Sequence, residues 1–274
     1  MNKSDITKMQ MMLLEDLKIF DQFCESHNIQ YFLSSGSLLG AIRHHGFIPW
    51  DDDLDIMLTR DNYEKLLLLF DQYPSGYLLL NNTNDESIPI IYSHLVDTRA
   101  AFYKRKSGTN HDYLHIDIYA CDYIKNNRFV KGRVANGLVL LINRVYSFRK
   151  GNVSIDNKSR ALKKIAIMVG NFILKNKTDE EMESLIRTLV GTSKDEGLMA
   201  PIASPYGFQK EMFPSKYYKE LIKVDFEDTI VPVSKYYDNI LKQLYGDYMT
   251  LPPEDQRYKE IQMYHFDINE SDNS

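Results

Sequence analysis

The sequence has few of the features that mark secreted or membrane-spanning proteins. It contains two cysteines, Cys24 and Cys121, which cannot form a disulfide framework and do not lie in a Cys-x-x-Cys pair. Residues 1–6 lack the basic start and apolar core of a signal peptide. No window approaches the roughly 18 to 20 uninterrupted apolar residues of a membrane span. We therefore expect a cytoplasmic protein of a reducing compartment, with peripheral contact at the inner face of the cell membrane as an option.

Acidic charge prevails overall, but basic charge is concentrated in one segment. The formal net charge is -5, whereas residues 125–177 hold 13 lysines and arginines and one acid, Asp156. This segment is either a solvated face that balances the acidic remainder, or a surface for anionic lipid headgroups or a phosphate-rich glycan acceptor. We favour the second interpretation, because apolar residues lie beside the charges. Nucleic acid is not an expected partner, since no binding motif for it is present.

Hydrophobic periodicity predicts a mixed α/β fold with an additional, mainly helical part. Helices are expected at residues 5–27, 37–43, 62–72, 134–145, 161–174, 178–190 and 234–245. Strands are expected at residues 31–33, 53–58, 77–80, 88–96 and 115–119. Residues 99–111 are predicted to form a loop or hairpin, and residues 191–226 an irregular, aromatic stretch. On the first helix, Leu13, Leu17, Phe20 and Cys24 share one face, which we predict to be core.

Four carboxylates occur within five positions, at Asp51, Asp52, Asp53 and Asp55. Such a cluster repels itself unless a cation or strong hydrogen-bond donors lie among the charges. On a strand, Asp53 and Asp55 would point to one face while Leu54 and Ile56 point into the core. Two carboxylates on one face can share a hard divalent cation, for which Mg²⁺ is the natural candidate. A solvated acidic loop is the alternative, and the alternation with apolar residues argues against it.

Two further features suit a nucleotide-dependent phosphoryl transfer. Gly36-Ser37 opens a helix after a strand, where a phosphate can approach exposed backbone N–H groups. Asp117 lies between Ile116 and Ile118 in a short apolar strand. A carboxylate in such a run is costly without a partner, which a shared metal ion would supply. Taken alone, Asp117 could equally be an ordinary hydrogen-bonded strand residue.

A Gly-Ser corner, an Asp-x-Asp strand and a lone strand aspartate together resemble the nucleotidyltransferase superfamily pattern. The longer string from Gly36 to Ile56, GSLLGAIRHHGFIPWDDDLDI, is similar to the signature of the LicD family of phosphocholine transferases, to which fukutin-type proteins are related. The resemblance continues in VDTR at residues 96–99 and IDI at residues 116–118. It reappears in FEDT at residues 226–229, LYGDYM at residues 244–249 and the Pro252-Pro253 pair. The basic middle of the chain matches least well.

This resemblance implies a Mg²⁺-dependent enzyme that moves phosphocholine from a CDP-linked donor to a cell-surface glycan, teichoic acid or lipopolysaccharide precursor, which would be lipid-linked. By position, Asp53, Asp55 and Asp117 would be the catalytic residues and metal ligands. Gly36, Ser37 and Arg43 would bind the substrate, with Arg43 reaching a phosphate bidentately. Ribitol, glycerol or another head group in place of choline would suit the same site.

Two other functions remain open from the sequence. One is a nucleotidyltransferase proper, which moves a nucleoside monophosphate from a triphosphate. The other is a non-catalytic nucleotide-binding protein on the same scaffold. In each case we expect a nucleotidyltransferase-like core of a mixed sheet flanked by helices at residues 1–125, a basic helical segment at 126–190 and a C-terminal part at 191–274 packing on the core.

Overall fold

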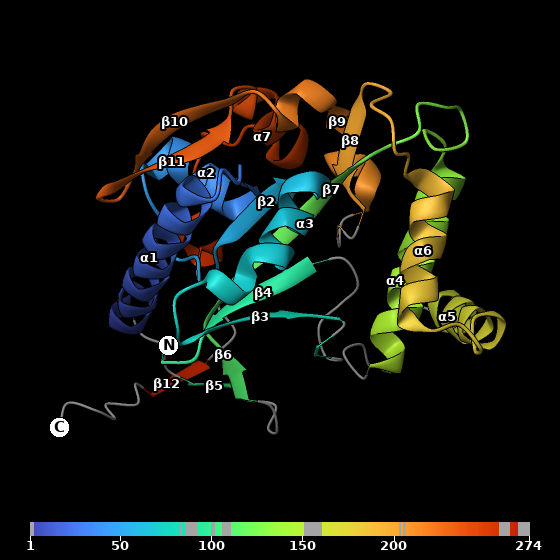
Figure 1. Cartoon of the computed structure of the whole chain (residues 1–274), viewed down its shortest axis with the longest axis horizontal. Coiled ribbons are helices and arrows are strands. Elements are labelled where there is room, and N and C mark those ends of the chain that lie inside the picture. Colours follow the sequence, from blue (N-terminus) through green and yellow to red (C-terminus); the bar gives the residue numbers. More distant parts are fainter. Residues whose placement is uncertain are drawn as a thin grey trace. The chain divides into compact units, whose positions relative to one another are not determined.

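A computed structural model of the chain describes residues 3–82, 84–85, 92–99, 102–105, 111–150, 161–202, 204, 207–257 and 264–267 (Figure 1). The described residues fall into two compact units. The first takes its residues from 1–79, 94–118 and 220–274, and the second from 80–93 and 119–219. The three-part division expected from the sequence stays a prediction beside these two units.

Four helices belong to the first unit: α1 (Lys3–Ser26), α2 (Ser35–His44), α3 (Arg60–Leu69) and α7 (Tyr237–Tyr245). The predicted core face of α1 is confirmed, because Leu13, Leu17, Phe20 and Cys24 are each at most 1% exposed. The helix expected at residues 62–72 begins earlier and ends as a short 3-10 turn, η1 (Phe70–Gln72). A second such turn, η4 (Glu254–Gln256), follows α7.

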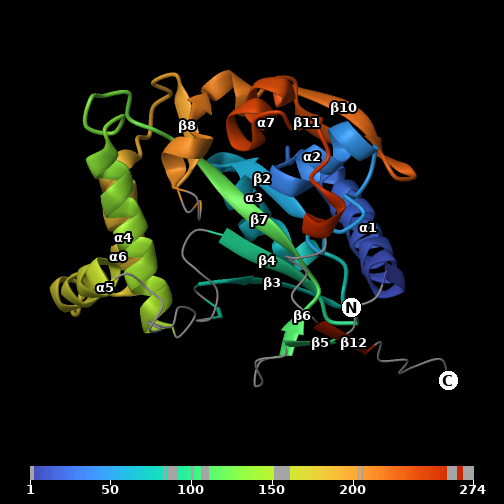
Figure 2. The same ribbon diagram turned by 180° about the vertical axis from the view of Figure 1, so that it is seen from behind.

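Seven of the described strands form one sheet, and five of them define its main order, β1-β2-β7-β4-β3. These are β1 (Phe32–Leu33), β2 (Asp55–Thr59), β7 (His115–Tyr123), β4 (Tyr92–Asp97) and β3 (Tyr77–Asn81). Figure 2 shows β2, β7, β4 and β3 following one another across the sheet. The Asp117 N–H donates to the Leu54 carbonyl at 2.9 Å, which brings the two predicted aspartate-bearing segments side by side. Leu54 and Ile56 are fully buried, as the alternation predicts.

Two smaller antiparallel sheets complete the first unit. A hairpin of β10 (Leu221–Phe226) and β11 (Thr229–Ser234) turns at residues 227–228. A three-stranded sheet has the order β12-β5-β6, formed by β12 (Tyr264–Asp267), β5 (Phe102–Arg105) and β6 (His111–Tyr113). The pairing of β5 with β6 supports the hairpin alternative for residues 99–111, of which residues 100–101 and 106–110 lie outside the described residues.

The second unit contains α4 (Arg133–Arg149), α5 (Ala161–Ile173) and α6 (Asp179–Val190), all three of which were expected. It also contains β8 (Leu198–Pro201), β9 (Phe213–Pro214), η2 (Phe208–Glu211) and η3 (Ser215–Tyr218). Its core brings together apolar residues of α4, α6, β8 and η2, among them Val139, Ile142, Ile186, Ala200 and Phe208. At the start of α6, Thr178 and Glu181 form a capping box, which satisfies N–H groups that the first turn leaves unpaired.

The mixed α/β prediction is confirmed, but the expectation of an irregular stretch at residues 191–226 is wrong in part. This stretch contains β8, β9 and β10. β8 is four residues long and pairs with a distant part of the chain, with Cys121 opposite Pro201. A strand of four residues is too short to show a clear alternation of apolar and polar residues. Its pairing with β7 depends on the tertiary fold and cannot be read from the local sequence. Within the described part of the chain, the helices are too short or too polar to cross a membrane.

Candidate active site

The acidic loop between α2 and β2 gathers three of the four clustered carboxylates. Ligand oxygens of Asp51, Asp52 and Asp53 all lie within 4.8 Å of one another. The loop is held from α1, where the Gln10 side-chain amide donates to the carbonyls of Ile48 at 3.0 Å and Asp51 at 2.8 Å. Fixing the loop backbone in this way keeps the carboxylates close together despite their mutual repulsion.

This crowding changes the acidity of the loop. Burial, and then the charges of Asp53 and Asp52, raise the pKa of Asp51 well above its ordinary value. Burial, followed by the charge of Asp117 and then that of Asp52, raises the pKa of Asp53 to about 6. Carboxylates whose ionisation is opposed by one another's charges gain most from a bound cation. The donor set is all oxygen, as Mg²⁺ prefers, so the loop fits the predicted metal.

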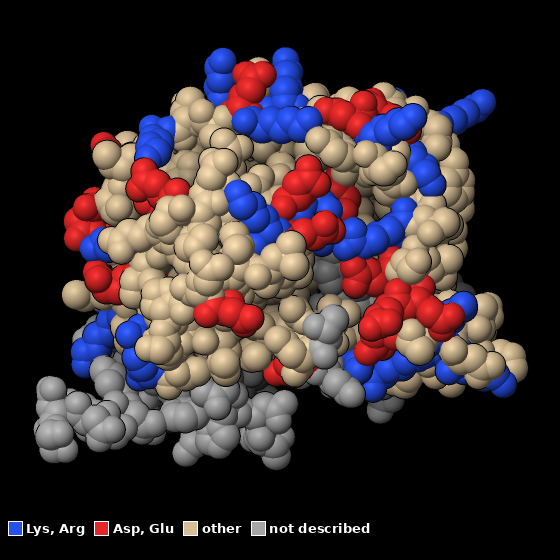
Figure 3. All heavy atoms as spheres, in the orientation of Figure 1, with Lys and Arg blue, Asp and Glu red and all other residues tan. Residues whose placement is uncertain are grey.

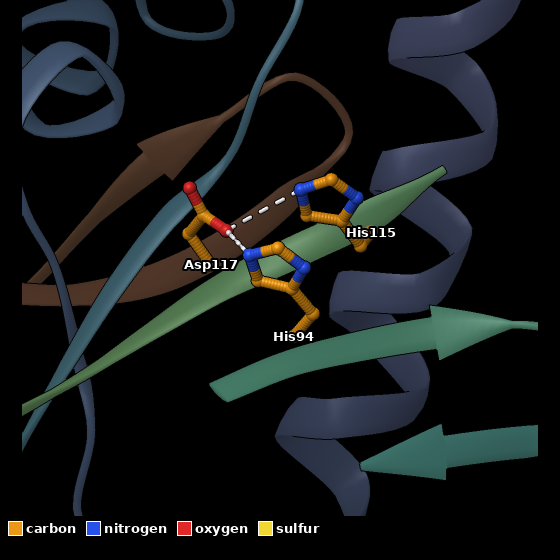
Figure 4. Close-up of side chains that lie close together, drawn as sticks. All are labelled: His94, His115 and Asp117. Atoms are coloured by element: carbon orange, nitrogen blue, oxygen red, sulfur yellow. Dashed lines mark ion pairs between the residues drawn. The ribbon is translucent and has the colours of Figure 1, made fainter. Parts of the chain in front are cut away.

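Asp117 lies on β7, and its carboxylate faces two neighbouring imidazoles, as Figure 4 shows. One of its carboxylate oxygens, Oδ1, is 3.1 Å from Nε2 of His94 and 3.4 Å from Nε2 of His115. The two rings are stacked, with centroids 3.9 Å apart and an interplanar angle of 11°. Both imidazoles therefore meet the same oxygen and restrict how the carboxylate can turn.

Neither histidine is among the site residues predicted from the sequence. His115 shares a strand face with Asp117 by the alternation of side chains, and this signal could have identified it. His94 lies on β4, and no local pattern links it to Asp117 because the sheet alone brings β4 beside β7.

The predicted phosphate cradle at the start of α2 is linked by a hydrogen bond to β2, the strand that carries Asp55. The Asp55 N–H donates to Ser37 Oγ at 2.8 Å, and both residues are buried. A Cβ added to Gly36 would lie 2.8 Å from Asp51 Oδ2, so a larger residue at position 36 would force this carboxylate to move. The side chain of Ser34 does not cap α2, and its buried hydroxyl has no hydrogen-bond partner among the described residues. The start of this helix thus keeps polar groups that a phosphate could satisfy.

Arg43, predicted to bind phosphate, lies near a second arginine that the sequence argument did not identify. Arg43 is half-buried, and its guanidinium donates to the Tyr248 carbonyl at 2.7 Å. Burial and the neighbouring charge of Arg257 lower the pKa of Arg43, while Asp51 acts in the opposite direction. The Arg257 guanidinium lies over the Trp50 ring, 5.4 Å from its centroid. Two cationic groups therefore lie close to the acidic loop.

The turn of the β10–β11 hairpin holds the loop that follows α2. Glu227 Oε1 accepts from the Phe47 N–H at 2.9 Å, and the Glu227 N–H donates to the His45 carbonyl at 2.8 Å. A Cβ on Gly46 would lie 2.1 Å from Glu227 Oε1, which excludes any larger residue there while Glu227 stays in place. The FEDT stretch thus contacts the loop that leads to the aspartates.

The structure brings some of the predicted site residues together more closely than others. Asp53 and Asp117 lie close enough for the charge of one to raise the pKa of the other. Two groups among the described residues have the spacing to hold a metal, Asp51 with Asp52 and Asp53, and His94 with His115 and Asp117. Asp55 is buried on β2 and belongs to neither group. The ligand set of Asp53, Asp55 and Asp117 stays a prediction, as do the substrate contacts of Gly36, Ser37 and Arg43.

Comparison with known proteins decides the family. The family model described as "LicD/FKTN/FKRP, nucleotidyltransferase domain" matches residues 28–137. The lipopolysaccharide cholinephosphotransferase LicD of Haemophilus influenzae is 30% identical over 271 residues, which cover 96% of this chain and 98% of that protein. The chain belongs to the LicD family. The resemblance found in the motifs is therefore confirmed.

The range matched by the LicD family model includes every aspartate and histidine of the site. Glu227 and Arg257 lie outside this range, in the part of the chain that the Haemophilus influenzae relative covers.

Two shorter matches are to uncharacterised proteins of Rickettsia. The one from Rickettsia typhi is 37% identical over 78 residues, or 27% of this chain and 25% of that protein. The one from Rickettsia prowazekii is 38% identical over 71 residues, or 26% of this chain and 27% of that protein.

Proposed function

We propose that the protein is a Mg²⁺-dependent transferase that moves phosphocholine from CDP-choline to a glycan acceptor. The observation that carries this proposal is the position of Asp53, which lies beside Asp51 and Asp52 and near enough to Asp117 for that charge to help raise its pKa to about 6. A group of carboxylates that raise one another's pKa values is typical of a functional site. The similarity over nearly the whole chain to a cholinephosphotransferase indicates which group is transferred.

Asp53, Asp55 and Asp117 would hold the metal ion, with Asp51 and Asp52 in support. When bound, Mg²⁺ would neutralise the charge of the donor diphosphate and favour departure of the nucleotide. Without such an ion, the carboxylates would repel the diphosphate that they must meet. Arg43 and Arg257 would supply further positive charge for the phosphates. The N–H groups at the start of α2 and the hydroxyl of Ser34 would donate hydrogen bonds to a phosphate oxygen.

In the proposed reaction, the oxygen of an acceptor hydroxyl forms a bond to the choline-bearing phosphorus. The bond between that phosphorus and the bridging oxygen breaks, and the electron pair leaves with CMP. Asp117 is our candidate to take the proton of the attacking hydroxyl. The contacts of His94 and His115 with its Oδ1 would keep the carboxylate pointing in one direction while it does so.

The acceptor that we propose is a lipid-linked cell-surface glycan, such as a lipopolysaccharide precursor. The support is the name of the Haemophilus influenzae relative, which acts on lipopolysaccharide. A teichoic acid precursor would present the same chemistry, a sugar or polyol hydroxyl on a lipid-anchored chain. We place the reaction in the cytoplasm, where CDP-linked donors would be at hand.

A nucleotidyltransferase proper is the second candidate, favoured by the description of the matching family model. Incubation with CDP-choline and with CTP, each with Mg²⁺, separates the two functions by nucleotide chromatography. Release of CMP from CDP-choline supports phosphocholine transfer, and release of pyrophosphate from CTP supports nucleotidyl transfer.

The decisive test compares Asp53→Asn and Asp55→Asn with the unchanged protein in the release of CMP from CDP-choline. We expect each substitution to lower the rate by about 100-fold or more, since each removes a charge that the transition state needs. Asp71→Asn is the matched control, because this aspartate lies in η1, outside the candidate site, and should leave the rate unchanged. Equal rates in all four proteins would refute the proposal.

A further inference from the structure

Helix α5 presents an apolar stripe that the rest of the described structure leaves uncovered. Its members recur at the spacing of one helix face and are each more than half exposed: Ile165 56%, Met168 59%, Val169 51%, Phe172 69% and Ile173 71%. Single exposed apolar residues are ordinary, but a contiguous stripe of large ones marks an interaction surface. We call these five residues the α5 stripe.

The opposite side of α5 is already used in packing. A Cβ on Gly170 would lie 2.9 Å from Val145 Cγ2, so the α5 backbone approaches α4 closely at this point. Ile167 is buried, and Leu174 packs against the core of the second unit. The stripe is therefore a second apolar face, separate from the face that packs on α4. Helix α5 thus has two apolar sides. One packs against α4 and the core of the second unit, and the other is the exposed stripe.

The charges around the α5 stripe have one sign. Residues 157–178 contain no acid, whereas lysines precede and follow the stripe at Lys163, Lys164, Lys175 and Lys177. The Lys175 ammonium lies over the Phe172 ring, 5.0 Å from its centroid, which keeps this charge beside the apolar surface. Lys177 pairs with Glu181 at 2.9 Å, so it contributes less to the field outside the helix.

We propose that the α5 stripe docks the protein on an anionic lipid bilayer, with the helix lying in the plane of the interface. A helix of 13 residues spans about 20 Å, too little to cross a bilayer but enough to lie in its surface. Phe172 and the aliphatic side chains enter the boundary between headgroups and acyl chains, and the flanking lysines meet the anionic headgroups.

Charge distinguishes a bilayer from a second copy of this chain as the occupant. Two α5 stripes facing each other would bring their lysines together without intervening acids, and like charges at an interface oppose association. The choice of a membrane rests also on the proposed function, since a lipid-linked acceptor would bring the enzyme to a membrane. Docking would then raise the local concentration of acceptor at the active site.

Co-sedimentation with lipid vesicles tests the proposal directly, because it measures binding and needs neither the CDP-linked donor, nor a metal ion, nor enzymatic activity. We expect the unchanged protein to sediment with vesicles of phosphatidylcholine and phosphatidylglycerol at low salt, and less with phosphatidylcholine alone or at high salt. Phe172→Ser/Ile173→Ser should lower the partition coefficient at least tenfold, because two of the most exposed apolar side chains of the stripe are lost. Leu68→Ser is the matched control, since Leu68 is 81% exposed on α3 and should not affect binding.

Asp53→Asn separates this inference from the proposed function. It should bind vesicles as tightly as the unchanged protein although it loses turnover, so either proposal can fail while the other stands. Thermal unfolding of each variant, monitored by circular dichroism, shows whether it is folded. Absence of the unchanged protein from anionic vesicles at low salt, or equal binding by the double variant, overturns the docking proposal. So does a change from dimer to monomer caused by the double variant in lipid-free solution, since the stripe would then be a protein interface.

Discussion

Among single residues, the two histidines beside Asp117 carry the most specific expectation. His94 and His115 both contact Oδ1 of this carboxylate, at 3.1 and 3.4 Å. Partners that orient a metal-binding group typically change metal affinity or activity by about 10- to 100-fold when they are removed. We predict a loss of this size in the Mg²⁺ affinity of His94→Ala, measured by calorimetry on the protein alone, together with a lower kcat.

A conservative variant tells orientation apart from mere packing. His94→Gln keeps a side-chain donor within reach of Asp117 and should recover part of the lost Mg²⁺ affinity. His27→Ala is the control, because His27 lies outside the site and interacts with Phe23 and Gln72. If His94→Ala and His94→Gln bind Mg²⁺ as the unchanged protein does, the histidine has no role in orienting Asp117.

Asp16 makes the stability of the protein depend on pH. It is buried and accepts a hydrogen bond from the Tyr77 hydroxyl at 2.8 Å. Burial and the nearby charge of Asp97 raise its pKa from 3.8 to about 7, against the opposing effects of Tyr77 and Arg99. Between pH 4 and pH 7 the folded state therefore holds a proton that the unfolded state has lost. The free energy of unfolding contributed by this group thus falls as pH rises through that range and levels off above pH 7.

We predict that Asp16→Asn removes this component of the pH dependence. The amide stays neutral and still accepts from Tyr77, so the variant should be more stable than the unchanged protein at pH 8, by on the order of 1 to 3 kcal/mol. Urea unfolding at pH 5 and at pH 8 measures the difference between the two proteins. Identical slopes with pH in both would show that Asp16 is ionised in the folded protein over the whole range.

At the scale of elements, the hairpin of β10 and β11 holds the loop after α2 in place through Glu227 at its turn. Gly46 can accept no Cβ, because that atom would lie 2.1 Å from Glu227 Oε1, and Glu227 in turn accepts from the Phe47 N–H. We predict that Gly46→Ala lowers the free energy of unfolding by about 1 to 3 kcal/mol, since Glu227 must move and leave this N–H without its acceptor. Urea unfolding measures this effect.

A double-mutant cycle shows whether the cost arises at Glu227. In a Glu227→Ala background the obstructing carboxylate is gone, so Gly46→Ala should cost much less than it does alone. Glu220→Ala is a matched control for the background, because this glutamate precedes β10 and pairs with Lys235 instead. Additive costs in the Glu227→Ala background would place the strain elsewhere in the loop.

How far the sequence predicts each element depends on whether its determinants are local. The run from Gly36 to Ile56 holds a helix start, a loop and a strand in consecutive residues, so the order of these elements and the burial of Leu54 and Ile56 were predictable. The expectation that Asp53 lies on the strand is wrong, because β2 begins at Asp55 and Asp53 belongs to the loop before it. His94, Glu227 and Arg257 reach the same region from distant positions, and no periodicity connects them. The predicted role of Ser37 shows the same limit, because the hydrogen bond from the Asp55 N–H to its hydroxyl depends on how α2 packs on β2.

At the scale of the whole molecule, part of the positive charge of the basic segment at residues 125–177 is neutralised by nearby acidic residues. Over α4 to α6, Figure 3 shows lysines and arginines among acidic side chains. Lys150 pairs with Asp179 at 2.8 Å and Lys177 with Glu181 at 2.9 Å, so the first turn of α6 neutralises part of the excess. If the α5 stripe docks on a membrane as proposed, we expect the lysines beside it to contribute more to binding than the segment as a whole. Apolar and basic groups together, rather than charge alone, would select a membrane.

This combination makes the turnover of the whole molecule depend on how its acceptor is presented. With an acceptor embedded in anionic vesicles, Phe172→Ser/Ile173→Ser should react at least tenfold more slowly than the unchanged protein, because fewer enzyme molecules occupy the surface. With a short, detached glycan acceptor in solution, the same two proteins should release CMP from CDP-choline at equal rates, since the site residues are untouched. Asp53→Asn should be slow with both acceptors. A double variant that is slowed equally on the embedded and the detached acceptor would show that α5 supports the fold of the enzyme rather than its place at the membrane.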